Sequence, residues 1–337
     1  MTDLLNAFVA FSNYVLVPAT AYGAQLALGA LGVTLIYGIL RFSNFAHGET
    51  MAFGAMVSVL LTGLFQSAGL SLGPLPTALL ALPFAILATA ALVLATDRVV
   101  YKFYRRVKAA PVMLVIVSMG VMFILNGLTR MFVGTDDRQF ADGERFLFTA
   151  PEFKAWSGLS EGLAIRTTQA LTVITAVIVV AILFWFLNRT RTGKSMRAYS
   201  DNEDLALLSG INPERVVMVT WLIVAALAAV AGTLYGLDKK FQPIVYVHLL
   251  LPIFASAIVG GLGSPIGAIA GGFVVAFSEV TLTYAFKKVV GYIGPEGWSP
   301  DGLVQLLSTD YKFAVSFAIL IIVLLFKPTG LFKGKSV

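Results

Sequence analysis

The sequence predicts an all-α, polytopic membrane helical bundle with about 8 spans plus a broken or re-entrant helix pair at 248–285. The first observation is composition: 58% of the residues are hydrophobic, 12% are charged and the mean hydropathy is +0.86. Soluble domains carry about a quarter charged residues. The second is a series of apolar blocks of about 20 residues, the length that crosses a bilayer. The third is a glycine- and proline-containing break inside the longest block.

The apolar blocks are taken in chain order. We expect a single transmembrane domain over 1–337, whose spans cover about 15–40, 50–68, 75–96, 111–133, 168–187, 216–237, 248–285 and 312–326. The seventh block is too long for one crossing. Its centre, Gly260 to Gly267, contains four glycines and Pro265, which break a helix. Two half-length or full helices meeting at a turn are therefore expected there.

Composition also excludes several kinds of site. The chain has no cysteine and only two histidines, His47 and His248. Disulfides and thiolate metal sites are therefore excluded, and we expect no metal and no cofactor. The segment 1–13 carries Asp3 and no basic residue, unlike the start of a cleaved signal peptide, so the first span is expected to remain.

Basic residues in short loops predict the orientation. The segment 97–110 contains five Lys and Arg and one acid, so we place it in the cytoplasm. Threading the spans from there puts the N-terminus and 134–167 outside, and 188–215 and the C-terminus inside. The inside then holds 14 of the 24 basic residues. The net charge of +6 is thus explained by membrane orientation, and no nucleic-acid partner is expected.

The external loop, about 134–167, carries six acids and is rich in aromatic residues from Phe146 to Trp156. It could cover the mouth of a pathway, receive an external protein, or be a solvated loop. These alternatives stay open from the residues alone.

The loop 188–215 is the longest mixed-charge segment between two strongly apolar blocks. Asp201 can cap a short helix over 202–209, and Gly210 can end it in a left-handed conformation. A capped helix within a loop favours a segment that binds a partner protein, although an ordered connector remains an alternative. Gly193-Lys194-Ser195 does not complete a phosphate loop, because the required upstream glycine is Asn188.

Polar residues inside the spans are candidates for a pathway. Glu279 is an intramembrane ionisable group, a functional candidate by default, but it could instead pair with Lys287 or Lys288. Asn126 could contact a substrate or join two helices. Irregular backbone at membrane depth is tolerated beside protein or a watery cavity. The candidate path residues are Gln25, Tyr37, Asn126, Ser264, Pro265 and Glu279.

The end of the first span reads Arg41-Phe-Ser-Asn-Phe-Ala-His-Gly-Glu49 and is placed on the cytoplasmic side. A His near a Glu could relay protons. Alternatively, Asn44, His47 and Glu49 could cap the next helix and fix the turn. Neither reading completes a catalytic constellation, and we expect no catalytic residues.

Three blocks, in order, carry a family resemblance: Ile36 to Glu49, Gly193 to Asn212, and Leu251 to Gly267 with Glu279. Together they resemble the branched-chain amino acid permease subunits of bacterial ABC importers, the LivH type. The family motif near the first span maps onto Asn44, His47, Gly48 and Glu49. Its ATPase-coupling loop maps onto Gly193, Arg197, Ala198, Asp201, Ala206, Gly210 and Ile211.

The resemblance implies a multi-pass permease of the bacterial inner membrane, without enzymatic activity of its own. It implies as partners a second homologous permease, two cytoplasmic ATPase subunits, a periplasmic substrate-binding protein and membrane lipid. The implied substrate is a branched-chain or related neutral amino acid. A permease for urea or short amides shares the three blocks, and a stand-alone ion-coupled carrier or channel is the alternative from another class.

Overall fold

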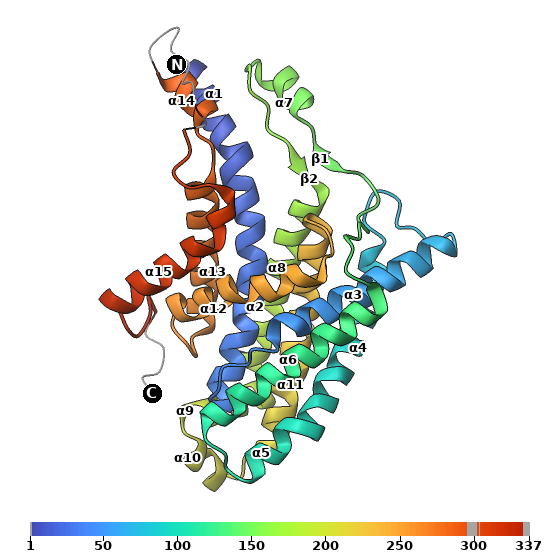
Figure 1. Ribbon diagram of the computed structural model, residues 1–337, viewed down its shortest axis with the longest axis vertical. Coiled ribbons are helices and arrows are strands. Elements are labelled where there is room, and N and C mark those ends of the chain that lie inside the picture. Colours follow the sequence, from blue (N-terminus) through green and yellow to red (C-terminus); the bar gives the residue numbers. More distant parts are fainter. Residues whose placement is uncertain (1, 295–301, 303, 333–337) are drawn as a thin grey trace.

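The structure is a computed structural model that describes residues 2–294, 302 and 304–332. Within these residues, nine helices are long and apolar enough to cross a membrane. Shorter helices occupy the connecting segments, and two short strands pair outside the helical body (Figure 1). The prediction of an all-α polytopic bundle is confirmed.

The first helix is longer than predicted. α1 (Thr2–Phe11), a π-helical turn (Ser12–Leu16) and α2 (Val17–Leu40) form one continuous helix of 39 residues. Its polar start is used to hold the outer loop: the Asn6 side chain accepts hydrogen bonds from the backbone N–H groups of Ser160 and Glu161, at 3.1 and 3.2 Å. The Asn13 side chain accepts one from Ala164 at 2.9 Å. These polar residues lie outside the hydropathy pattern, which explains the late predicted start.

The remaining spans follow the predicted blocks, with extensions at their ends. α4 continues through a π-helical turn into α5 as one helix, Ala78–Arg106. The bounds of the elements after α2 follow, with α4 and α5 given separately. In order they are α3 (His47–Ser67), α4 (Ala78–Thr96), α5 (Lys102–Arg106), α6 (Pro111–Val133), β1 (Phe146–Phe148), α7 (Ala150–Ser157), β2 (Ile165–Arg166), α8 (Thr167–Arg189), α9 (Arg191–Asp201), α10 (Glu203–Leu208), α11 (Pro213–Asp238), α12 (Pro243–Gly260), α13 (Pro265–Thr283), α14 (Lys287–Ile293), a 3₁₀ turn (Thr309–Tyr311) and α15 (Lys312–Phe326).

α2 is the centre of the bundle. It is buried on all sides and packs against α13, α11, α12 and α8 (Figure 1). Small residues let these backbones approach closely, as is usual between helices in membranes. A Cβ added at Gly272 of α13 would lie 2.7 Å from the backbone nitrogen of Ala27 in α2. Glycine is therefore required where α13 crosses α2.

The predicted break at 248–285 separates two full-length helices. α12 has 18 residues and α13 has 19, so each can span the membrane. The turn between them contains Gly261 and Gly263 at φ 109° and 84°, a region of the backbone map that favours glycine. The Ser264 hydroxyl then caps α13 by accepting from Gly267 N at 3.1 Å. The sequence left open half-length or full helices, and the structure decides for full ones.

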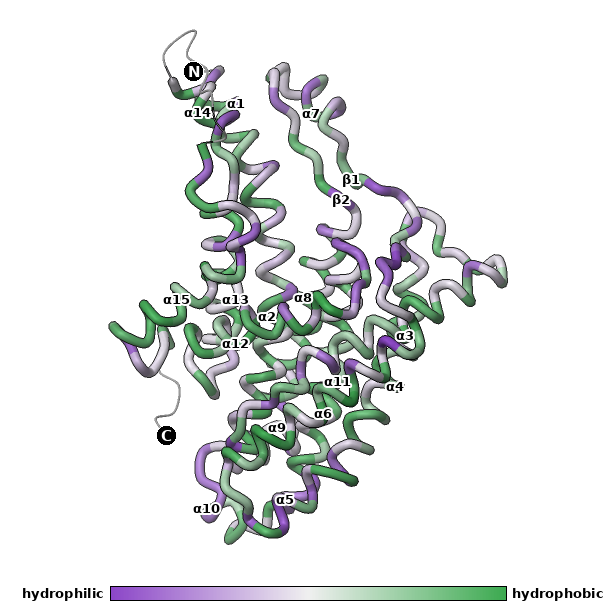
Figure 2. The backbone as a smooth tube through the Cα atoms, in the orientation of Figure 1, coloured by the Kyte–Doolittle hydropathy of each residue, from purple (hydrophilic) through white to green (hydrophobic). Residues whose placement is uncertain are grey.

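The polar segments gather at two opposite ends of the bundle, as Figure 2 shows for α5 with α10 and for α7 with α14. At the first end, Lys102 Nζ lies 2.8 Å from a Glu214 carboxylate oxygen. At the other, Arg138 and Phe241 pair through their backbones. The segments 97–110 and 188–215 therefore share one end, as the charge pattern predicted. Residues 295–301 and 303 of the charged stretch before the last span, and Lys333 and Lys335 of the basic tail, lie outside the described residues.

At the end that holds residues 134–167, the predicted external loop, Glu161 joins this loop to α14. Its carboxylate accepts hydrogen bonds from Lys288 Nζ and Tyr292 OH, both at 2.8 Å. Burial opposes ionisation of Glu161, but these bonds outweigh it and hold its pKa below the usual value. The bond to Glu161 raises the pKa of Lys288. The pairing therefore contributes its stabilisation between the unfolded pKa values, about 4.3 for Glu and about 10.4 for Lys.

We expect the external loop to detach from α14 as the pH falls below about 4 through the lowered pKa of Glu161. Because the chain has no cysteine, spin labels on Lys154→Cys and Ile293→Cys can report this distance by pulsed electron paramagnetic resonance. The distribution should broaden reversibly in acid. In a Glu161→Gln background the distribution should already be broad at neutral pH and should not respond to acid. The same response to acid in the native protein and in the Glu161→Gln protein contradicts the assignment.

Candidate functional site

The segment between α8 and α11 folds into two short helices with a side-chain cap at every start. The Thr190 hydroxyl accepts from Gly193 N at 3.0 Å and opens α9. The Asn202 side chain accepts from Leu205 N at 3.0 Å and opens α10. Gly210 follows α10 with φ 80°, as predicted for a left-handed ending.

The predicted cap at Asp201 is wrong by one residue. Asp201 is the last residue of α9, and Asn202, in an extended conformation, takes the capping position of α10. The two neighbours are both residue types that cap well, so composition alone did not distinguish them. Asp201 instead ends α9, and the cap of α10 is the next residue, Asn202.

α9 is anchored to the bundle on one face. Met196 and Tyr199 are buried, and a Cβ added at Gly193 would lie 2.2 Å from the carbonyl oxygen of Phe186 in α8. Arg197 donates to the Asn188 side chain at 3.0 Å. Arg41, in a left-handed conformation at the end of α2, donates to the carbonyl oxygen of Ser200 at 2.8 Å. α9 is therefore tied to both α8 and α2.

α10 turns the opposite way, with its apolar side chains outward. Leu208 is 86% exposed and Leu205 is 62% exposed, whereas Ala206 is buried against the bundle. Ile211 is partly buried against the core, and Ala198 lies on the outer side of α9. Leucines exposed at the polar end of a membrane protein, where water and not lipid surrounds them, indicate a protein contact.

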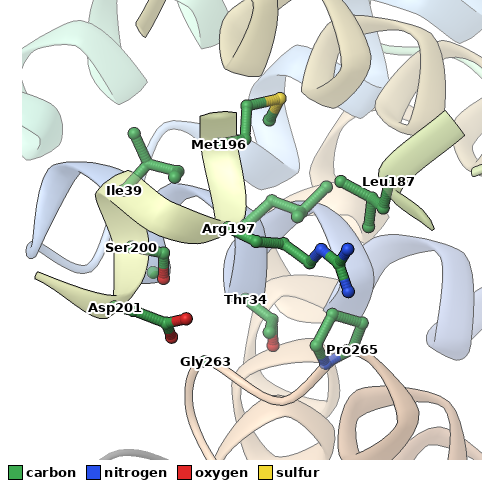
Figure 3. A pocket seen from close by; sticks show the side chains of 11 residues that line it. Thr34, Ile39, Leu187, Met196, Arg197, Ser200, Asp201, Gly263 and Pro265 are labelled. Atoms are coloured by element: carbon green, nitrogen blue, oxygen red, sulfur yellow. The ribbon is translucent and has the colours of Figure 1, made fainter. Parts of the chain in front are cut away.

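A cavity of about 190 Å³ lies where α9 meets the bundle. Figure 3 shows Arg197 and Asp201 of α9 facing Thr34 of α2 and Pro265 of α13 across it. The Thr34 hydroxyl is buried and finds no hydrogen-bond partner among the described residues. The cavity thus joins α9, α2 and the α12–α13 turn, which are far apart in the sequence.

The motif after the first span lies deeper than predicted. His47 Nε2 is 3.0 Å from the carbonyl oxygen of Gly29, in the middle of α2 rather than at its end. A Cβ added at Gly32 would lie 2.4 Å from the His47 ring, so glycine makes the room for it. Residues 41–46 therefore begin at the α9 end, where Arg41 contacts Ser200, and return into the bundle before α3 begins.

The other members of that motif make contacts between helices. Asn44 accepts from Ala46 N and from the Tyr101 hydroxyl, both at 3.1 Å. A Cβ on Gly48 would lie 2.8 Å from the carbonyl oxygen of Tyr246 in α12. No side chain caps α3, so the predicted cap is not observed, but Asn44 fixes the turn before α3 through its bond with Ala46 N. His47 instead joins α3 to α2, Asn44 joins the turn before α3 to Tyr101, and Gly48, having no side chain, lets α3 approach α12 closely.

Comparison with known proteins places the chain in a family. The family model described as the permease component of the branched-chain amino acid transport system matches residues 15–324. The chain belongs to this family. The match covers both the segment with α9 and α10 and the α12–α13 turn.

Curated relatives agree over most of this permease. It is 32% identical over 316 residues to the high-affinity branched-chain amino acid transport system permease protein LivH of Escherichia coli K12, covering 92% of this chain and 91% of that protein. It is 29% identical to the corresponding protein BraD of Pseudomonas aeruginosa, with 94% of each covered. The fructose import permease protein FruG of Bifidobacterium longum is 30% identical over 149 residues, 43% of this chain and 42% of that protein.

Two solved structures resemble the permease more remotely. An inward-facing putative metal-chelate type ABC transporter has a TM-score of 0.48 and 15% identity, covering 97% of this chain and 95% of that one. PsaBC from Streptococcus pneumoniae in complex with Fab has a TM-score of 0.43 and 14% identity, covering 98% and 93%. At this level of likeness neither structure assigns a residue of this permease.

The predicted path residues of the permease do not form one cluster. Ser264 and Pro265 lie at the α9 end, at the start of α13. Asn126 of α6 donates to Glu49 of α3 at 3.0 Å, the joining contact that was one of its two expected roles. Gln25 is buried in α2 without a partner for either amide atom among the described residues, and Tyr37 is partly buried. A continuous path through these residues remains a prediction.

Glu279 of the permease is fully buried, but its expected partners are wrong. Its carboxylate lies 3.7 Å from Lys312 Nζ and accepts a short hydrogen bond from the Ser316 hydroxyl, both on α15. Lys288 pairs with Glu161 instead. The Lys312 ammonium also lies 3.8 Å above the ring of Tyr22 in α2. Sequence reasoning missed Lys312 because it starts the last span, 33 positions from Glu279, and only tertiary packing joins them.

Proposed function

We propose that this permease is the membrane-spanning subunit of an ATP-driven importer in the bacterial inner membrane. It translocates branched-chain or related neutral amino acids by alternating access. Its partners are a second homologous permease, two cytoplasmic ATPase subunits and a periplasmic binding protein. The N-terminus is periplasmic and the C-terminus cytoplasmic. ATP is hydrolysed by the partner subunits and not by this chain.

The observation that carries the proposal is the two-sided form of the segment α9–α10. One side is tied to α2 and α8 through Arg41, Arg197 and the buried Met196. The other side leaves Leu205 and Leu208 exposed, free for a partner subunit. Motion of a partner that grips α10 would therefore reach the centre of the bundle through α9. The named relatives, which are amino acid transport permeases, support the substrate class.

The test is reconstitution in liposomes of the permease with its second permease, ATPases and binding protein. We expect leucine uptake that requires ATP and every partner, with unlabelled isoleucine and valine competing. The permease alone should accumulate nothing. Uptake by the permease alone, driven by an ion gradient, would support the carrier alternative. Competition by urea or acetamide but not by leucine would move the substrate to the short amides.

A further inference from the structure

A second cavity, larger than the one beside α9, lies at the opposite end of α11 from the segment α9–α10. Its volume is about 440 Å³, within the range of about 300–1,000 Å³ that is typical of small-molecule sites. α11 has 26 residues, so the two ends of this helix lie about 39 Å apart. The cavity is bounded by residues 139–145 of the external loop, the start of α8 and the turn after α11.

Acidic and basic side chains together line this outer cavity. Acidic side chains come from the external loop and the end of α11, and basic side chains from the loop, the start of α8 and the turn. The charged groups are Asp142, Glu144 and Asp238, with Arg145, Arg166, Lys239 and Lys240. A purely acidic or purely basic lining would favour a simple ion, whereas this lining matches a ligand that is itself a zwitterion.

Asp238 is the acidic lining residue whose carboxylate has one oxygen without a hydrogen-bond partner among the described residues. Its side chain is 3% exposed. One carboxylate oxygen lies 3.5 Å from Lys239 Nζ, and the other is buried without a hydrogen-bond partner among the described residues. An unpaired buried carboxylate oxygen is costly. Asp238 also ends α11, where the helix dipole is negative and favours a cation. An ammonium group placed here would satisfy both.

Other charged groups of the cavity already have partners. Asp142 accepts from the Thr77 backbone and hydroxyl at 2.7 and 2.6 Å and from Gln66 at 3.0 Å, so it fixes the loop. Lys240 lies 3.7 Å from Asp137. Arg166, which directly precedes α8, is then the cation best placed for a carboxylate. Lys239 pairs with Asp238 at 3.5 Å, and it becomes available to the carboxylate when the ammonium group of the ligand takes its place beside Asp238.

We propose that this cavity is an acceptor site for the zwitterionic head of an amino acid on the outer face of the permease. Asp238 binds the ammonium group, and Arg166 with Lys239 binds the carboxylate. Because charged side chains from three segments dominate the lining, beside only Phe140, Ala141 and Leu237 as apolar side chains, the site recognises the head shared by all amino acids and leaves the choice of side chain to other parts of the system. The site rests on the proposed function, since it presumes an amino acid substrate.

The experiment uses the full complex of permease subunits and ATPases in nanodiscs without binding protein. Direct binding is measured by saturation-transfer nuclear magnetic resonance with leucine, with leucinol, which lacks the carboxylate, and with 4-methylpentanoate, which lacks the amine. Leucine should bind at least about tenfold more tightly than either analogue, the effect of one lost charge-assisted hydrogen bond. Asp238→Asn should weaken leucine at least about tenfold and change 4-methylpentanoate little.

The matched control is Glu152→Gln, an equal loss of charge on the exposed helix α7, outside the cavity. It should bind leucine as the native complex does. A melting temperature shared by the native and Asp238→Asn complexes shows that the fold is retained. Arg166→Gln tests the proposed carboxylate contact, since it should weaken binding of leucine and leave binding of leucinol unchanged.

The site is overturned if the native complex binds no leucine, if Asp238→Asn binds leucine normally, or if Asp238→Asn weakens only docking of the binding protein. In those cases ATP-driven leucine uptake by the complete native system still supports the proposed function. Absence of such uptake for any amino acid overturns the proposed function itself.

Discussion

Gly271→Val should prevent the permease from reaching its folded state. A Cβ at this position would lie 2.0 Å from the carbonyl oxygen of Ser256 and 2.8 Å from the backbone nitrogen of Gly260, both in α12. A backbone atom cannot rotate away as a side chain does. α13 cannot retreat either, because the next residue, Gly272, packs against Ala27 of α2. Overpacking costs about 1–3 kcal/mol in ordinary cores, and we expect at least the upper value here.

The measurement is the yield of monodisperse protein after detergent extraction, together with its melting temperature. Gly120→Val is the matched control, since it makes the same change within a membrane helix, α6. No described heavy atom lies within 4 Å of a Cβ added there. The control should keep the native yield and melting temperature. Equal losses for both variants would show that the loss reflects valine in a membrane helix and not the contact between α12 and α13.

Leu208→Asp should abolish transport without unfolding the permease. Leu208 is 86% exposed at the end of α10 and contributes nothing to the core. Under the proposed function it is buried by an ATPase subunit, and a buried leucine contributes about 1.5–3 kcal/mol. The substitution also places a carboxylate in that apolar contact. Recovery of the ATPases with the permease should therefore fall by at least about tenfold, the effect of about 1.4 kcal/mol.

Co-purification of the ATPase subunits and ATP-driven leucine uptake should be measured on the same preparations. Leu147→Asp is the control, because Leu147 is 64% exposed on β1, at the opposite end of the bundle. It should recover the ATPases as the native permease does. Normal assembly and uptake with Leu208→Asp would show that α10 is not the contact with the ATPase.

The contacts of α10 also separate the two readings of its loop. An ordered connector needs only its buried face, which Ala206 supplies. The outward leucines are then unexplained, because side chains that stay in water contribute no hydrophobic stabilisation. Substitution on the outer face therefore distinguishes a connector, which tolerates it, from a coupling helix, which does not.

The sequence by itself determined the class of fold, the positions of the apolar blocks and the break at 260–265, whereas the structure decided that both helices beside the break are full-length. Hydropathy and helix-breaking residues are local properties, and a bilayer enforces them because backbone groups must be satisfied within each helix. It also determined which loops share an end, through the basic residues, and the family, through three blocks of residues. The left-handed Gly210 was predictable for the same reason, since few other residues tolerate that conformation.

Only the tertiary structure decided where the polar side chains meet. Glu279 pairs with Lys312 rather than with Lys287 or Lys288 because α15 packs on α13. His47 lies at the middle of α2 because Gly32 leaves room for its ring and its Nε2 hydrogen-bonds with the carbonyl oxygen of Gly29. Asn202 rather than Asp201 caps α10 because α9 extends one residue further. The outer cavity brings Asp238 and Arg166 together from separate helices. Such meetings depend on how helices cross, which periodicity within one helix does not encode.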